Sequence, residues 1–312
     1  MPPVEPGPES YAHPALRFFV ATRPAFLSVT LVASLIGMAA AWADGVEVDP
    51  LLALATLLAA LCAHACVNVL NDVHDAEADA QNRERIYPYT GGSRFIQNRV
   101  MAAADLEKFG WSLFGAVVLA GLWLSFLSGP GLVLIGLVGL FLGWSYSAPP
   151  LRLASRGLGE FAVAGGWLLV VMGADYVQRG HYDAGAFVAG LPFALLVTNL
   201  LLVNEFPDWR ADAASGKHTL VVRLGRRNAR WLHLGLSGAA GGWTIAALLA
   251  GLIPIACCAA LLGLVPSVQA GQALLRHAEQ PQELLPAISG SIVALLLFGV
   301  LMAGGLLMGG RA

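Results

Sequence analysis

Long apolar stretches, separated by shorter polar segments, make up most of this 312-residue chain. Most of them contain about 20 residues, the length that an α-helix needs to cross the hydrocarbon core of a bilayer. The pattern predicts an all-α membrane protein in which nine transmembrane helices form a bundle, and tight turns favour antiparallel neighbours. The predicted spans run near 22–43, 50–71, 106–128, 131–147, 158–178, 185–205, 231–251, 253–274 and 284–308.

The composition supports a membrane protein and excludes several soluble classes. Charged residues make up 12% of the chain, whereas a soluble globular domain carries about 25%. The mean hydropathy is +0.69. A formal net charge of −2 offers no broad basic surface for nucleic acid. All four cysteines lie in apolar stretches, where we expect them to pack as small apolar side chains rather than form disulfides.

The start of the chain lacks the apolar core of a cleavable signal peptide. We expect residues 1–14 to be a disordered leader, rich in proline, and residues 15–312 to form a single domain. With nine spans, 16 of the 18 lysines and arginines fall on the same side as the N-terminus. The positive-inside rule then predicts a multi-pass protein of the cell inner (cytoplasmic) membrane, with its N-terminus and longer loops in the cytoplasm.

Two matched acidic motifs interrupt the apolar pattern at the ends of the second and sixth predicted helices. Segments 71–79 and 204–212 both read N-(D/E)-x-x-D-x-x-x-D, with one constant offset of 133 residues. Positions i, i+3 and i+7 share one face of a helix, although Pro207 is expected to kink the second motif. The acids predicted to project together are Asp72, Asp75 and Asp79 in the first motif, and Glu205, Asp208 and Asp212 in the second.

Six carboxylates near one membrane surface repel one another, and divalent cations would neutralise them. Oxygen ligands suit Mg²⁺, which binds through one or two carboxylates plus substrate phosphates. A diphosphate on a long isoprenoid offers phosphates to this site and an apolar tail to the bundle. Arg94 and Lys217, each in a glycine-containing turn after an acidic motif, are candidates to bind the diphosphate oxygens. A single motif would also fit a solvated helix cap, but two matched copies argue against it.

These segments resemble the UbiA superfamily of intramembrane prenyltransferases. The resemblance rests on the two acidic motifs, on Tyr146–Leu153 with Gly157–Glu160, and on Gly216-Lys217-x-Thr219-Leu220. It implies a nine-helix bundle with a cytosol-facing cap over a central cavity. It also implies two Mg²⁺ ions bridged by the substrate diphosphate, ionisation of the allylic C–O bond, and attack by an electron-rich aromatic ring.

The resemblance also implies residue roles. The six acids of the two motifs correspond to metal ligands. Asp72, Asp75, Asp208, Lys217 and Tyr146 correspond to catalytic groups. The residues expected to bind substrate are Arg23, Asn68, Asn71, Arg94, Asn204 and Lys217.

Within the superfamily, the run Gly91-Gly92-Ser93 and the Asn-Glu form of the second motif resemble the 1,4-dihydroxy-2-naphthoate polyprenyltransferase branch of menaquinone (quinone) biosynthesis. The glycine usual in that branch is missing from segment 96–99. 4-Hydroxybenzoate, homogentisate, chlorophyllide or a lipid therefore stay open as acceptors. An ion-coupled membrane transporter is the alternative from another class, but it would place its acids near mid-bilayer rather than at helix ends on one side.

Overall fold

The computed structural model describes residues 4–11 and 13–310, and over these ranges the chain is all-α, without a strand. The α-helices are α1 (Pro14–Ala21), α2 (Ser28–Ala43), α3 (Pro50–His74), α4 (Ala76–Gln81), α5 (Ala103–Ser128), α6 (Gly131–Ser147), α7 (Gly159–Arg179), α8 (Ala184–Ala214), α9 (Leu220–Leu224), α10 (Arg226–Leu249), α11 (Leu264–His277) and α12 (Leu285–Gly309). Three 3₁₀ segments are η1 (Ala154–Arg156), η2 (Ile255–Gly263) and η3 (Pro281–Glu283). The all-α character of the predicted fold is confirmed in this part of the chain.

Seven helical segments of the described chain are long and apolar enough to cross a membrane: α3, α5, α7, α8, α10, the continuous η2–α11 run and α12. The apolar helices α2 and α6 are shorter, with 16 and 17 residues. Every apolar stretch predicted from the sequence contains one of these segments. The chain is therefore a multi-pass membrane protein.

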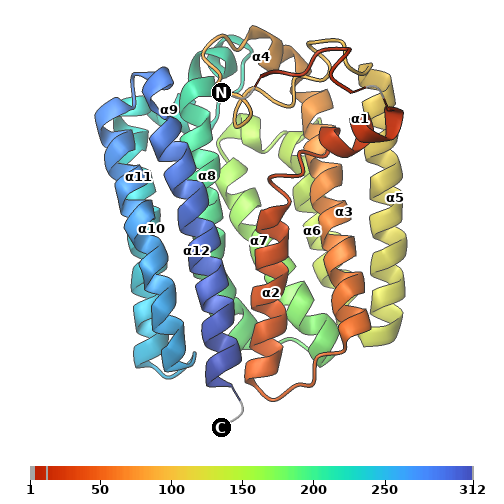
Figure 1. Cartoon of the computed structure of the whole chain (residues 1–312), viewed down its shortest axis with the longest axis vertical. Helices are drawn as coiled ribbons and strands as arrows, with labels where there is room; N and C mark the ends of the chain where they lie inside the picture. Colours follow the sequence, from red (N-terminus) through yellow and green to blue (C-terminus); the bar gives the residue numbers. More distant parts are fainter. Residues whose placement is uncertain (1–3, 12, 311–312) are drawn as a thin grey trace.

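The helices run side by side along the long axis of the molecule, with α2, α7, α8 and α12 packed against one another at its centre (Figure 1). Glycines permit the closest approaches. A Cβ on Gly299 of α12 would collide with Val32 of α2 and with the ring of Phe193 on α8. On the outside, α5 exposes large apolar side chains, among them Leu119 and Phe126, which are 70% and 86% exposed. Apolar surface of this extent is expected to face lipid.

The two acidic motifs have different backbones at the same end of the bundle, the upper end in Figure 1. Helix α3 ends at His74, and Asp75 separates it from α4 with φ −96° and ψ 5°. The single helical face predicted for the first motif is therefore interrupted. Helix α8 instead continues through Pro207 to Ala214. The neighbouring side chain of Phe206 is fully buried, and this packing on the adjacent helices supports the turn that proline weakens.

Residues 4–11 lie across the upper end of the molecule, beside the loop that follows α4 (Figure 1). This placement differs from the disorder predicted for residues 1–14. Arg17 Nε donates to Tyr11 O at 2.8 Å, and the Tyr11 ring stacks on buried Phe95 with 5.7 Å between centroids. Contacts of this kind offset the entropy lost on ordering the chain. Residues 1–3 and 12 of the predicted leader lie outside the described residues.

Candidate active site

A polar cavity of about 150 Å³ lies where the two acidic motifs meet at the end of the bundle. Its walls come from α3, α4, α6 and α8, together with the loops after α1, α4 and α8. Most of the residues singled out from the sequence line it: Arg23, Asn71, Asp75, Asp79, Tyr146, Asn204, Glu205, Asp208, Asp212 and Lys217.

Each motif presents an asparagine and two aspartates, at positions i, i+4 and i+8, to the cavity. These are Asn71, Asp75 and Asp79 in the first motif and Asn204, Asp208 and Asp212 in the second. Asn71 Nδ2 donates to Asp75 Oδ2 at 2.9 Å and so orients that carboxylate. Its counterpart Asn204 has a buried Oδ1 without a hydrogen-bond partner. A buried acceptor left unpaired is costly, which makes Asn204 a candidate to bind a ligand here.

Lys217 joins the two motifs. Its Nζ lies 3.0 Å from Asp75 Oδ2 and 3.3 Å from Asp212 Oδ1. The local sequence explains the position: α8 ends at Ala214, and Gly216 adopts φ +75°, the left-handed conformation that commonly closes a helix. Burial by itself would lower the pKa of Lys217, but the negative charges of Asp75 and Asp212 outweigh burial and raise its pKa well above the usual value. The ammonium is therefore fully charged at neutral pH.

The loop between α4 and α5 covers the acidic cluster with both backbone and side-chain donors. Ser93 N–H donates to the Asp72 carboxylate at 3.2 Å, and Asn82 Nδ2 donates to Asp208 Oδ1 at 2.5 Å. Gly92 has φ +72°, and a Cβ there would collide with the Asp79 carboxylate. Gly92 of the glycine pair noticed in the sequence is thus needed for close approach of the loop to the carboxylates.

Three predicted site residues do not line the cavity. Asp72 is buried beneath Ser93 and accepts its backbone N–H, so it lies beside the cavity rather than facing into it. Asn68 donates to Thr22 O at 2.9 Å. Arg94 reaches the carbonyl oxygen of Asp79 at 2.5 Å and is 6% exposed. Helical spacing predicted Asp72 as a site residue but not the direction of its side chain, which the contact with Ser93 decides.

Glu205 lines the cavity but also has a partner in the protein. Its Oε2 accepts the backbone N–H of Val221, near the start of α9, at 3.1 Å. A carboxylate is favourable at this position because the first N–H groups of a helix lack intrahelical acceptors. Glu205 therefore ties α8 to α9 as well as contributing charge to the cavity.

Several lining residues were not among the predicted site residues: Phe26, Tyr89, Thr90, Ala154, Leu201 and Thr219. Asn82, which binds Asp208, was missed as well. Thr219 belongs to the Gly216-Lys217-x-Thr219-Leu220 segment, so the sequence pattern could have indicated it. The others come from separate loops and helices, so no spacing in the sequence connects them.

The buried carboxylates around the cavity repel one another. Burial raises the pKa of Asp79 well above its usual value, and the negative charges of Asp75, Asp72 and Asp208 raise it further. Within residues 4–11 and 13–310, no three Asp, Glu, His or Cys side chains form a ready-made metal cage. The donors are oxygens shared between two helix ends. That arrangement fits Mg²⁺, which is usually held by one or two carboxylates plus substrate phosphates.

A sequence profile described as the UbiA prenyltransferase family matches residues 30–291 of the chain. The chain belongs to the UbiA prenyltransferase family. It is therefore an enzyme, a prenyltransferase, rather than the transporter considered as an alternative. The same family was inferred above from the two acidic motifs and the glycine-lysine turn, and that inference is confirmed.

Two bacterial relatives illustrate where the chain lies within the UbiA family. It is 26% identical to the 1,4-dihydroxy-2-naphthoate octaprenyltransferase of Bacillus subtilis over 92% of this chain and 91% of that protein. It is 30% identical to the enzyme of the same name from Mycobacterium tuberculosis, over 87% of this chain and 89% of that protein. A UbiA homologue from Archaeoglobus fulgidus, solved bound to GPP and Mg²⁺, has the same fold with a TM-score of 0.60 at 12% identity, covering 92% of this chain and 99% of that one.

Proposed function

We propose that this enzyme transfers a prenyl group from a polyprenyl diphosphate to an aromatic acceptor in a reaction that requires Mg²⁺. The observation that carries the proposal is the meeting of both acidic motifs and Lys217 around one cavity at the end of an apolar bundle. The Archaeoglobus homologue bound to GPP and Mg²⁺ supports the same substrate class. The diphosphate would lie at the polar end, and the prenyl chain would extend among apolar helices.

The four aspartates that line the cavity are proposed to hold two Mg²⁺ ions: Asp75, Asp79, Asp208 and Asp212. Mg²⁺, when bound, neutralises the diphosphate and lets it leave with its bonding electrons. Lys217 donates a charged hydrogen bond to the departing diphosphate. Asn71 and Asn204 are proposed to bind the substrate beside these aspartates. We assign Asp72 to holding the loop through Ser93 rather than to the metal set, because its carboxylate accepts that backbone N–H.

Arg23 and Tyr146 also line the cavity and are proposed to act on the substrate. Arg23 NH2 lies 3.4 Å from the carbonyl oxygens of Pro88 and Tyr89, and its guanidinium stacks 4.7 Å from the Phe26 ring centroid. These contacts hold a positive charge at the start of the bundle, where it attracts the diphosphate. Tyr146 lines the cavity from α6, where we place it near the reacting carbon.

The proposed acceptor is 1,4-dihydroxy-2-naphthoate, and the product would serve menaquinone biosynthesis. Support comes from the Gly91-Gly92-Ser93 run and from relatives of that name that align over most of both chains. We further propose that α2 and α6 also cross the bilayer, giving nine spans. In that topology the end that carries the cavity faces the cytoplasm, because it carries nearly all basic residues.

Purified protein in lipid nanodiscs, given Mg²⁺, labelled octaprenyl diphosphate and a panel of acceptors, tests the proposal. 1,4-Dihydroxy-2-naphthoate should be prenylated faster than 4-hydroxybenzoate or homogentisate. Asp75→Ala and Asp208→Ala should abolish turnover while the protein still inserts. Glu77→Ala is the matched control, because Glu77 is an exposed acid within the first motif. Near-normal turnover in both aspartate variants would refute the metal assignment, and preference for another acceptor would refute the branch.

A further inference from the structure

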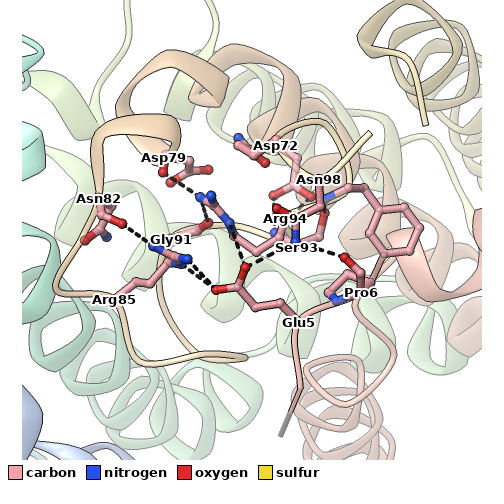
Figure 2. A network of polar contacts seen from close by, with 12 residues as sticks. Glu5, Pro6, Asp72, Asp79, Asn82, Arg85, Gly91, Ser93, Arg94 and Asn98 are labelled. Atoms are coloured by element: carbon pink, nitrogen blue, oxygen red, sulfur yellow. Dashed lines mark hydrogen bonds and ion pairs between the residues drawn. The ribbon is translucent and has the colours of Figure 1, made fainter. Parts of the chain in front are cut away.

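The N-terminal segment makes its strongest contacts through one carboxylate, that of Glu5 (Figure 2). Glu5 Oε1 accepts from Arg85 Nε and lies 2.6 Å from both Nε and NH2 of that guanidinium. Glu5 Oε2 accepts from Asn98 Nδ2 at 3.2 Å and lies 3.7 Å from Arg94 Nε. Asn98 Nδ2 also donates to Pro6 O at 2.9 Å. Three side chains of the loop between α4 and α5 therefore converge on one acid that lies outside this loop.

These loop residues lead directly to the cavity. Arg85 NH1 donates to Asn82 O at 2.6 Å, and the Asn82 side chain donates to Asp208. Arg94 NH1 donates to the backbone oxygens of Asp79 and Gly91, which belong to residues lining the cavity. Figure 2 shows Arg94 between Glu5 on one side and Asp79 on the other. The path from Glu5 to the carboxylates is thus two hydrogen-bonded residues long.

Arg94 also needs external support. Its backbone has φ +68°, a conformation that is strained for a non-glycine residue and persists only when its surroundings hold it. Its Nε is buried without a hydrogen bond and lies 3.7 Å from the Glu5 carboxylate, with which it forms an ion pair. The Glu5 carboxylate therefore compensates a buried positive charge at a strained position of the loop. Hydrogen bonds and opposite charges lower the pKa of Glu5 against the opposing effect of burial, so Glu5 is ionised at neutral pH.

We propose that Glu5 is a positioning residue for prenyl transfer. Residues 4–11 act as a strap that holds the loop of residues 82–99 against the acidic cluster, and Glu5 is its anchor. The loop in turn presents Asn82 and the Gly91–Ser93 backbone to the carboxylates. This role rests on the proposed function for its kinetic consequence, but the strap itself is a property of the fold.

The strap is tested by hydrogen exchange of the peptide that contains residues 90–93, measured by mass spectrometry on the full-length protein in nanodiscs. Thr90, Gly91 and Gly92 line the cavity, and Ser93 N–H donates to Asp72. None of these residues is a partner of Glu5, so their exchange reports loop position rather than the lost contact. In Glu5→Ala, exchange should be faster by about tenfold, the factor that corresponds to one charge-assisted hydrogen bond. Glu9→Ala is the matched control, because Glu9 is exposed on the same segment.

Kinetics test the consequence for the reaction. Glu5→Ala should raise the KM for prenyl diphosphate by about tenfold and change kcat less, and Glu5→Asp should recover part of the loss. Unchanged exchange at 90–93 in Glu5→Ala overturns the strap, whatever the activity of the protein. Faster exchange with an unchanged KM, or with a higher kcat/KM, overturns the positioning role. If the wild-type protein prenylates no acceptor, the proposed function fails while the exchange measurement still decides the strap.

Discussion

Replacing Lys217 by methionine should separate diphosphate binding from metal binding. Nζ contacts carboxylates of both motifs, at 3.0 and 3.3 Å, and the side chain is only 17% exposed. A buried donor that stabilises charge developing in a transition state contributes about 3–4 kcal/mol, so kcat/KM should fall about 100- to 1000-fold. Methionine retains the approximate length of the side chain while removing its charge.

The constants for the two ligands, Mg²⁺ and prenyl diphosphate, should change in opposite directions. Without the ammonium, Asp75 and Asp212 attract Mg²⁺ more strongly, so the apparent activation constant for Mg²⁺ should decrease. The KM for prenyl diphosphate should increase, because a positive donor to the phosphates is lost. Initial rates across a matrix of Mg²⁺ and octaprenyl diphosphate concentrations measure both constants in one experiment.

Arg227→Ala is the matched control for Lys217. Arg227 also pairs with an acid, Glu279, at 3.1 Å, but its side chain is 79% exposed. An exposed pair of this kind contributes little, so its kinetics should match those of wild type. A loss smaller than about tenfold in Lys217→Met, equal to 1.4 kcal/mol, would refute the role of Lys217 as a donor to the leaving group. Parallel changes in the two constants would refute the electrostatic reasoning.

Four further outcomes follow from the site. Gly92→Ala should greatly reduce turnover without preventing insertion, because the added Cβ collides with the Asp79 carboxylate; a steady-state assay with a detergent-extraction control measures this. Asn82→Ala removes the 2.5 Å hydrogen bond to Asp208 and should lower kcat/KM about tenfold or more, and a wild-type value would contradict the contact. Chelation with EDTA should abolish prenyl transfer, and added Mg²⁺ should restore it, whereas persistent turnover would exclude the metal requirement. Because the pKa of Lys217 is raised, its contribution to stability is present below the unfolded pKa of about 10.4 and is lost only as pH rises through the folded value. The difference in thermal stability between wild type and Lys217→Met should therefore not decrease between neutral pH and about pH 9, and a decrease over that range would contradict the assignment.

The length of the chain's hydrophobic stretches determines most of the fold. Each predicted apolar stretch contains an observed helical segment, because a span must satisfy its backbone hydrogen bonds within itself and needs a fixed length to cross the bilayer. The helix ends were less predictable. Helix α8 continues through Pro207, and the first motif is broken at Asp75, because packing and loop contacts decide where a polar helix end stops.

Within the site, the spacing of residues along the sequence indicated the acids of the two motifs. Tertiary contacts decided which of these acids face the cavity. The sequence alone placed Asp75, Asp208 and Lys217 in one site, because a repeated acidic motif in an apolar chain demands neutralisation. Only the tertiary structure turned Asp72 toward Ser93 and Arg94 toward the backbone of Asp79. It also brought in Asn82 and Glu5, which no spacing links to the motifs. Periodicity is a property of one helix, whereas a cavity wall is made by segments that meet only after the chain has folded.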